Sequence, residues 1–134
     1  MSWKISFHII GDNISPKKVN FKFNEENEAD EIAKKGRYRG SKFGYGSSTY
    51  IVPEEIKRKN KFEHLADIFV PMVNELKIAG AESWHIDIAK LYFNQSKEEL
   101  GVDELMQITR LNCPLTYSAY SVSDQEERKG FEIT

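Results

Sequence analysis

The feature that most constrains the fold is a change of hydrophobic period between residues 61 and 93. Apolar residues first recur at helical spacing, at Phe62, Leu65, Ile68, Phe69, Met72, Val73 and Leu76. After residues 79–81 the period becomes two, because Trp84, Ile86 and Ile88 alternate with His85 and Asp87. The pattern predicts a helix over 62–79 that leads directly into a half-buried strand.

Two details of this stretch modify the prediction. Pro71 removes a backbone donor and crowds the preceding turn, so we expect a kink or a restart of the helix near Val70. Leu91 and Phe93 fall on the opposite face from the apolar residues that begin the strand. Either a bulge near Ala89 resets the alternation, or both faces of the strand are covered at its end.

Further strands and one more helix are expected on either side of this stretch. Alternation predicts strands over 3–10, 47–52 and 115–120. A second, short helix is expected over 103–110, with Val102, Leu105 and Ile108 facing inward and Met106 as a further inward candidate. Ser15-Pro16 has the form of a helix start, whereas residues 19–23 fit a strand and a helical turn equally well.

These elements predict an α+β two-layer sandwich. We expect a four- to five-stranded sheet with two helices, 62–79 and 103–110, packed on one face. The 134 residues suffice for a single domain (1–134), with a core over about 3–122 and a charged tail over 123–134. A lone Cys113 and a start without a signal peptide or membrane segment favour the cytoplasm.

Charged residues are grouped into runs of one sign, although the chain as a whole is nearly neutral. An acidic run, Glu25, Glu26, Glu28, Asp30 and Glu31, precedes a basic run, Lys34, Lys35, Arg37, Arg39 and Lys42, and the net charge is only -2. Residues 34–46 also hold Tyr38, Phe43 and Tyr45, a mixture typical of single-stranded nucleic-acid surfaces. The alternative is a solvated loop, and the small net charge gives no overall attraction to nucleic acid.

Candidates for chemistry are sparse. His85 and Asp87 lie two apart on one side of a predicted strand and form a possible acid–base or ligand pair, with a solvated sheet face as the alternative. His8 is expected to be a solvated strand histidine, and Cys113 a small buried residue before Pro114. No metal-binding spacing or dinucleotide fingerprint occurs, so we expect no enzyme, no metal and no cofactor.

Several motifs in order resemble a bacterial family known as domain of unknown function 4279. They are the Gly11-Asp12 turn, Ser15-Pro16-x-x-Val19, Lys35-Gly36, Ser47-Ser48-x-Tyr50, the mid-helix Pro71, and the Gly101–Leu111 helix leading to Leu115–Tyr120. The resemblance covers residues 3–122. Tyr50 replaces the tryptophan expected there, and residues 34–46 and the tail depart furthest from the pattern.

The resemblance implies a function carried by the surface. The family has no established activity, and small α+β proteins of this type are similar to the immunity proteins encoded beside bacterial toxins. The expected partner is a cognate protein toxin whose active site is occluded, and nucleic-acid binding and then an uncharacterised enzyme are the alternatives. The expected partner-binding residues are Glu25, Glu26, Glu28, Asp30, Tyr38, Tyr45 and Tyr92. The oligomeric state is left open.

Overall fold

In the part of the chain that the structure describes, the fold consists of a five-stranded sheet and three α-helices. The computed structural model of the chain describes residues 2–12, 14–27, 46–92 and 99–121. Along the chain these residues form β1 (Ser2–Gly11), the 3-10 helix η1 (Pro16–Lys18), β2 (Glu25–Asn27), β3 (Gly46–Ile51), α1 (Arg58–Phe69), α2 (Val73–Ile78), β4 (Ser83–Tyr92), α3 (Val102–Leu111) and β5 (Leu115–Ser121). The predicted α+β class is confirmed.

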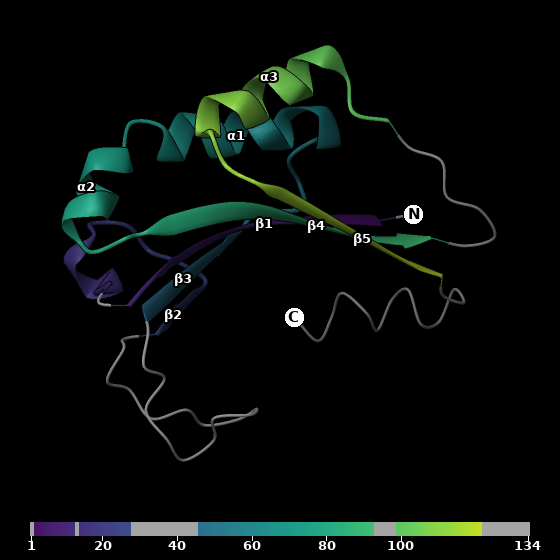
Figure 1. Cartoon of the computed structure of the whole chain (residues 1–134). Coiled ribbons are helices and arrows are strands. Elements are labelled where there is room, and N and C mark those ends of the chain that lie inside the picture. Colours follow the sequence, from purple (N-terminus) through teal and green to yellow (C-terminus); the bar gives the residue numbers. More distant parts are fainter. Residues whose placement is uncertain (1, 13, 28–45, 93–98, 122–134) are drawn as a thin grey trace.

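The sheet and the helices form two layers. The strand order is β2-β3-β1-β4-β5, and every neighbouring pair is antiparallel except the parallel pair β4–β5. Helices α1, α2 and α3 all lie on one face of this sheet (Figure 1). The passage β4–α3–β5 therefore crosses the helical face to reach a parallel strand, as parallel pairing requires.

The expected break at Pro71 divides the predicted helix into two. Helix α1 ends at Phe69 and α2 begins at Val73, with Pro71 exposed in the turn between them. In this turn Met72 N–H donates to the Phe69 carbonyl at 3.1 Å, a bond to the third residue back rather than the fourth. Because proline has no N–H to donate, the α-helical ladder cannot continue through it. The single helix over 62–79 is thus corrected to two.

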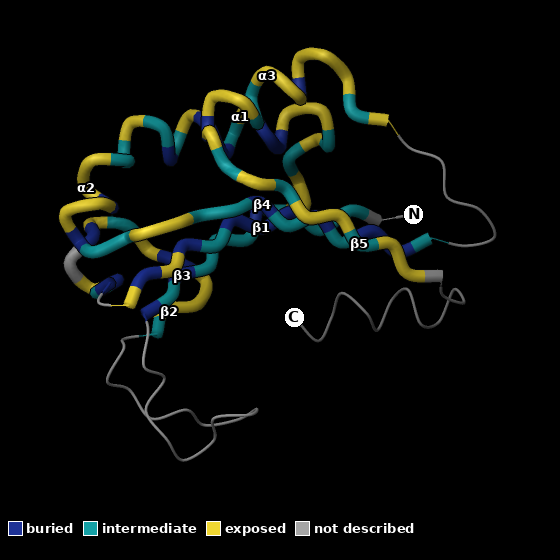
Figure 2. Tube along the Cα trace, viewed as in Figure 1, coloured by how far each residue is buried: buried dark blue, intermediate teal, exposed yellow. Residues whose placement is uncertain are grey.

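The core lies between the helical layer and the apolar face of the two central strands. Ile5, Phe7 and Ile9 of β1 are buried, as alternation predicted, and so are Ile86 and Ile88 of β4 (Figure 2). From the helical side the buried face of α1 contributes Phe62, Leu65, Ala66 and Phe69. The rings of Phe7 and Phe69 stack with centroids 4.4 Å apart, which joins the two layers at the centre.

Residues 19–23 adopt neither of the two predicted conformations. They belong to no helix and no strand, so both alternatives were wrong. Val19 and Phe23 are nevertheless buried, and the half-buried ring of Phe21 packs edge-on against Phe69 with centroids 5.4 Å apart. The apolar alternation reflects burial of an irregular segment against the core.

Helix α3 is rotated relative to the prediction. Ile108 packs against the core, but Val102, Leu105 and Met106 are 74%, 48% and 60% exposed. Their expected inward orientation was therefore wrong. Glu104 is buried instead, and its Oε1 accepts a hydrogen bond of 3.0 Å from the Gly101 N–H at the start of the helix. This cap stabilises the first turn with Glu104 facing inward.

The end of β4 is covered on both faces. Its pairing with β1 runs without interruption from Ser83 to Leu91, so this ladder holds no bulge at Ala89. Lys90 on the helical face and Leu91 on the opposite face are both buried. The second of the two alternatives is the correct one.

None of the helices in the described ranges has both the length and the apolar character needed to cross a bilayer.

Candidate binding surface on the outer face of the sheet

The sheet face turned away from the helices carries a group of polar side chains. We call it the outer face, and no helix among the described residues covers it (Figure 1). Alternation along the strands and their register bring together Lys4, Ser6, His8, Glu25, Thr49, His85, Asp87 and Thr116. These side chains come from all five strands.

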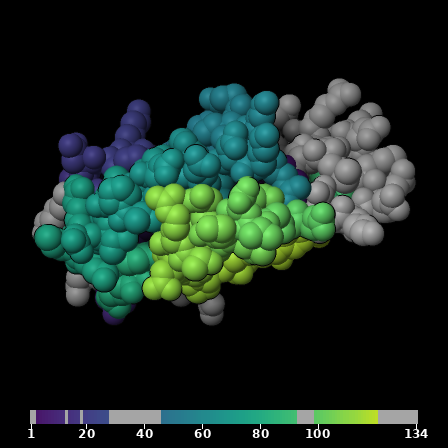
Figure 3. Space-filling view, turned by 90° about the horizontal axis from the view of Figure 1, so that it is seen from above, coloured from purple at the N-terminus to yellow at the C-terminus, as the bar shows by residue number. Residues whose placement is uncertain are grey.

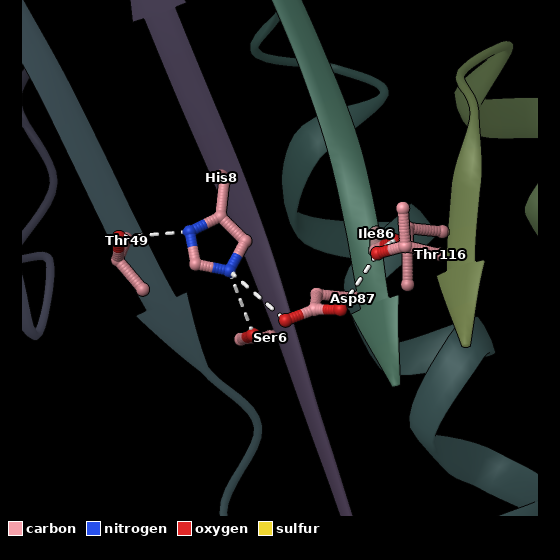
Figure 4. Close-up of polar contacts among 6 residues, drawn as sticks. All are labelled: Ser6, His8, Thr49, Ile86, Asp87 and Thr116. Atoms are coloured by element: carbon pink, nitrogen blue, oxygen red, sulfur yellow. Dashed lines mark hydrogen bonds and ion pairs between the residues drawn. The ribbon is translucent and has the colours of Figure 1, made fainter. Parts of the chain in front are cut away.

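His8 lies at the centre of this group. Its Nε2 is 2.9 Å from the Ser6 hydroxyl and its Nδ1 is 3.1 Å from the Thr49 hydroxyl (Figure 4). In a neutral imidazole one of these nitrogens donates and the other accepts, and a hydroxyl can take either part. Both ring nitrogens are therefore satisfied, and His8 is an ordered, half-buried side chain. The expectation of a solvated strand histidine was wrong.

His85 stacks on His8 from the neighbouring strand. The two residues face each other directly in the β1–β4 ladder, and their rings are nearly parallel, with centroids 4.9 Å apart and planes at 16°. Cross-strand neighbours on one face are close enough for side chains to interact. The predicted placement of His85 on the polar side of β4 agrees with this geometry.

Asp87 links β1 to the edge strand β5. Its Oδ1 accepts a hydrogen bond of 2.6 Å from the Thr116 hydroxyl, and its Oδ2 lies 4.0 Å from His8 Nε2. Figure 4 shows Asp87 between the imidazole on one side and Thr116 on the other. Two hydrogen-bonded groups therefore lie side by side on this face: Thr49, His8 and Ser6 form one, and Asp87 and Thr116 form the other.

The surroundings of His8 favour the neutral ring. Burial lowers the pKa of His8 below its ordinary value, and the neighbouring His85 lowers it further. Asp87 and Glu25 act in the opposite direction with smaller effect. His8 is therefore uncharged at neutral pH. Burial also lowers the pKa of Lys4, against the opposing effects of Glu25 and Asp87.

The residue types match a hydrolytic triad, but their connections do not. In a triad the serine and the carboxylate contact different nitrogens of the histidine. Here Ser6 and Asp87 both approach Nε2, and Nδ1 is bonded to Thr49. Ser6 is also buried. Ser6 is therefore not placed as the nucleophile of such a triad.

Metal ligands are not gathered in the described part of the chain. No group of three or more His, Cys, Asp or Glu side chains in those ranges is arranged to hold an ion. Cys113, which the sequence placed before Pro114 as a small buried residue, is half-buried and packs against the core. Burial raises the pKa of its thiol, so the reactive thiolate is disfavoured.

The predicted partner-binding residues are only partly brought together. Glu25 and Glu26 are both exposed on β2. Glu25 pairs with Thr49 and shares the outer face, whereas Glu26 pairs with Ser48, whose side chain is buried on the helical side. Alternation therefore splits this part of the acidic run between two faces. Four predicted residues lie outside the described part of the chain: Glu28, Asp30, Tyr38 and Tyr45.

Tyr92 lies apart from Glu25. It is the half-buried last residue of β4 and shares the alternation of Ile86, Ile88 and Lys90, which places it on the helical side of the sheet. The basic and aromatic segment 34–46, the basis of the nucleic-acid alternative, falls outside the described residues except for Gly46.

Sequence reasoning missed several members of the outer-face network. Ser6, Thr49 and Thr116 were not singled out, although alternation over 3–10 places Lys4, Ser6 and His8 on one side. The pairing of β1 with β3 and β4 joins segments far apart in the chain, and this register carries the missing information. A further polar pair, the Tyr50 hydroxyl and His64 Nε2 at 2.7 Å, joins β3 to α1.

Comparisons with known protein families, with curated proteins and with solved structures found no match for this chain. The resemblance to domain of unknown function 4279 therefore stays a prediction.

Proposed function

We propose that this protein is a non-catalytic binding protein, an immunity protein that neutralises a cognate toxin by covering its active site. The outer face of the sheet is the proposed contact surface. The single observation that carries the proposal is a pair of hydrogen-bonded groups on this face, Ser6–His8–Thr49 and Asp87–Thr116, with no helix of the described chain above them.

Side chains on the outer face that are already held by hydrogen bonds favour binding of a partner. A side chain that is already held in place loses less conformational entropy when a partner docks. His8, Asp87 and Thr116 are each held by a neighbour on this face, while Asp87 keeps 40% of its side chain exposed. A five-stranded platform of this kind supports the interface of about 800 Å² per partner that specific complexes use.

Charge indicates the kind of surface that would fit. Glu25 is exposed at the β2 side of the outer face and Asp87 lies near its middle, with Lys4 as the cation among them. Acidic groups on a docking surface speed encounter with a basic partner and disfavour acidic ones. The substrate groove of a nuclease is basic, so a nuclease toxin is the expected class of partner.

The test is binding to the product of an adjacent gene, measured by co-purification and isothermal titration calorimetry. We expect a one-to-one complex. The Glu25→Lys substitution should raise the dissociation constant by about tenfold or more, since it reverses a charge within the contact surface.

Glu26→Lys is the matched control. It makes the same charge change on the same strand, but Glu26 lies opposite Ser48 and not on the outer face. We expect its affinity to stay within about twofold of the unmodified protein, as for charges outside an interface. Equal losses in both variants would exclude the outer face as the contact surface. Failure of every adjacent gene product to bind would remove the toxin assignment itself.

A further inference from the structure

Strand β5 is an edge that lacks the usual protection against pairing. Residues 115–121 contain no charged side chain and no proline, and within the described residues no strand lies on the far side of β5. Natural sheets blunt such edges with charges, prolines, bulges or very short strands. The opposite edge follows that rule, because β2 has three residues and carries exposed Glu25 and Glu26.

Every second residue of β5 turns its backbone hydrogen-bonding groups away from β4, toward an edge on which the described part of the chain places no strand. Ile86 N–H donates to the Pro114 carbonyl at 3.0 Å, and Thr116 pairs with the next position along β4. In a parallel ladder, backbone groups that face the partner strand recur at every second residue. Even-numbered residues of β5 therefore face β4, and the N–H and C=O groups of Leu115, Tyr117 and Ala119 point to the open edge.

An apolar stripe on α3 lies beside this edge. Arg110 contacts Asp67 of α1 at 3.2 Å, which fixes the side of α3 that faces α1. By helical periodicity Leu105 lies on the other side, with Val102 and Met106 on top. These three side chains are largely exposed. Figure 3 shows α3 at the same margin of the molecule as the atoms of β5.

We propose that two copies of this chain dimerise through this margin. Their β5 strands pair antiparallel about a two-fold axis, so that the sheet continues from one copy into the other, and their α3 stripes pack together above it. A two-fold axis places the same patch of both copies in contact, so β5 meets β5 and the α3 stripe meets the α3 stripe, each in antiparallel orientation.

Charge and area identify the second copy as the occupant. The β5 edge and the Val102–Leu105–Met106 stripe are uncharged, so an identical copy meets no like-charge repulsion, whereas a strongly charged partner finds no opposite charge there. A stable dimer needs about 800 Å² per copy. The seven-residue edge, the α3 stripe and the exposed ring of Tyr117 on the helical side contribute toward that area, and the exposed ring of Tyr120 adds to it from the outer face.

The test is sedimentation velocity of the full chain over a range of micromolar concentrations. We expect a concentration-dependent species of twice the chain mass. Ala119→Pro removes only an N–H that points to the open edge, a position where sheets tolerate proline. Leu105→Glu places a carboxylate in the α3 stripe. Each should raise the dimer dissociation constant by about tenfold or more, through a lost ladder bond or a buried charge.

The control is Ile78→Glu on α2, a side chain that is 87% exposed and lies outside the proposed interface. It should leave the dissociation constant unchanged. Hydrogen exchange adds a second readout, since the amides of Tyr117 and Ala119 should gain protection on dimerisation and those of Thr116 and Ser118 should not.

A chain that stays monomeric over this range overturns the proposal. So does a dimer whose dissociation constant is unchanged in both variants. If circular dichroism shows that Ala119→Pro fails to fold, Leu105→Glu decides the outcome alone, because it does not alter the sheet. Glu25→Lys lies at the opposite edge and should leave dimerisation intact, so this proposal and the toxin-binding proposal fail independently.

Discussion

His8 shows how one residue can connect surface order to pH. Its imidazole is held between two hydroxyls and stacked on a second imidazole, and these contacts suit a neutral ring. Protonation would place a charge on a half-buried ring beside His85, and these two effects lower the pKa of His8. The outer face is therefore best ordered when His8 is uncharged.

We predict that the free energy of unfolding decreases as the pH falls below about 6.5, the ordinary pKa of histidine. Folding lowers the pKa of His8, so the unfolded chain binds more protons below that value. Stability is then fully present above the unfolded pKa and is lost as the pH falls toward the folded pKa. Urea unfolding at a series of pH values measures the slope, and His8→Gln should make it shallower.

The slope should not vanish in His8→Gln, because burial also lowers the pKa of His64. Nuclear magnetic resonance titration gives a direct check on the cause. His85→Ala should raise the pKa of His8, since the neighbouring imidazole lowers it. A His8 ring that titrates above its ordinary value in the unmodified protein would contradict this account.

At the scale of elements, the end of β1 is locked to the connection between α2 and β4. The Gly80 carbonyl lies so close to Gly11 that a Cβ at this position would overlap it. Glu82 N–H donates to the Ile10 carbonyl at 3.0 Å, and Asp12 N–H donates to the Glu82 carboxylate at 2.8 Å. The two segments approach backbone to backbone, which only glycine permits.

We predict that Gly11→Ala lowers the free energy of unfolding by about 1–3 kcal/mol, the usual cost of forcing atoms into a packed site. Chemical denaturation measures the change. Gly101→Ala serves as the control, because a Cβ there meets its nearest neighbour, Glu104 Oε1, at an ordinary 3.7 Å. Its cost should stay below about 1 kcal/mol. Equal costs at both glycines would contradict the close approach.

Local sequence patterns predicted where helices and strands lie, but they did not predict which face of α3 is turned toward the core. Pro71 acts through its own missing N–H, so the break between α1 and α2 could be predicted from one residue. The inward face of α3 could not, because the buried carboxylate of Glu104 takes a place that apolar periodicity assigned to Leu105. That exchange depends on the Gly101 cap and on Arg58, whose Nη2 lies 3.7 Å from Glu104 Oε1.

In the candidate site, too, local patterns predicted some features, whereas others depend on contacts between distant segments. Alternation alone placed His85 and Asp87 on one side of a strand, and it also separates Glu25 from Glu26. The meeting of His8 with Thr49 depends on which strands pair and in what register. Register is set by the burial of whole strands and by turns, so no short stretch of sequence contains it.

For the whole molecule, one core holds the two layers together. Phe69 is fully buried at its centre, and its ring contacts those of Phe7, Phe21, Phe23 and Tyr50, with centroids 4.4 to 6.2 Å apart. These contacts join β1, β3, α1 and the irregular segment 19–23. Loss of this ring should therefore destabilise the described structure as a whole.

We predict that Phe69→Ala lowers the free energy of unfolding by about 3–5 kcal/mol, as a cavity at a buried ring does. Urea unfolding followed by circular dichroism and by the fluorescence of Trp3 and Trp84 should give coincident curves, because the helices and the sheet share this core. Ile68→Ala, at a partly buried neighbour, should cost less. Separate transitions for the two probes would contradict a single cooperative unit.

The central position of β1 has a consequence for synthesis on the ribosome. Of the five described strands, β1 is synthesised first. Its neighbours in the sheet, β3 and β4, both follow it, and β4 is made only after α1 and α2. Until then the apolar side of β1, with Ile5, Phe7 and Ile9, has no complete shelter. Contacts between distant segments form slowly, and exposed strands invite aggregation. The order of synthesis therefore delays burial of this strand until the later segments have emerged.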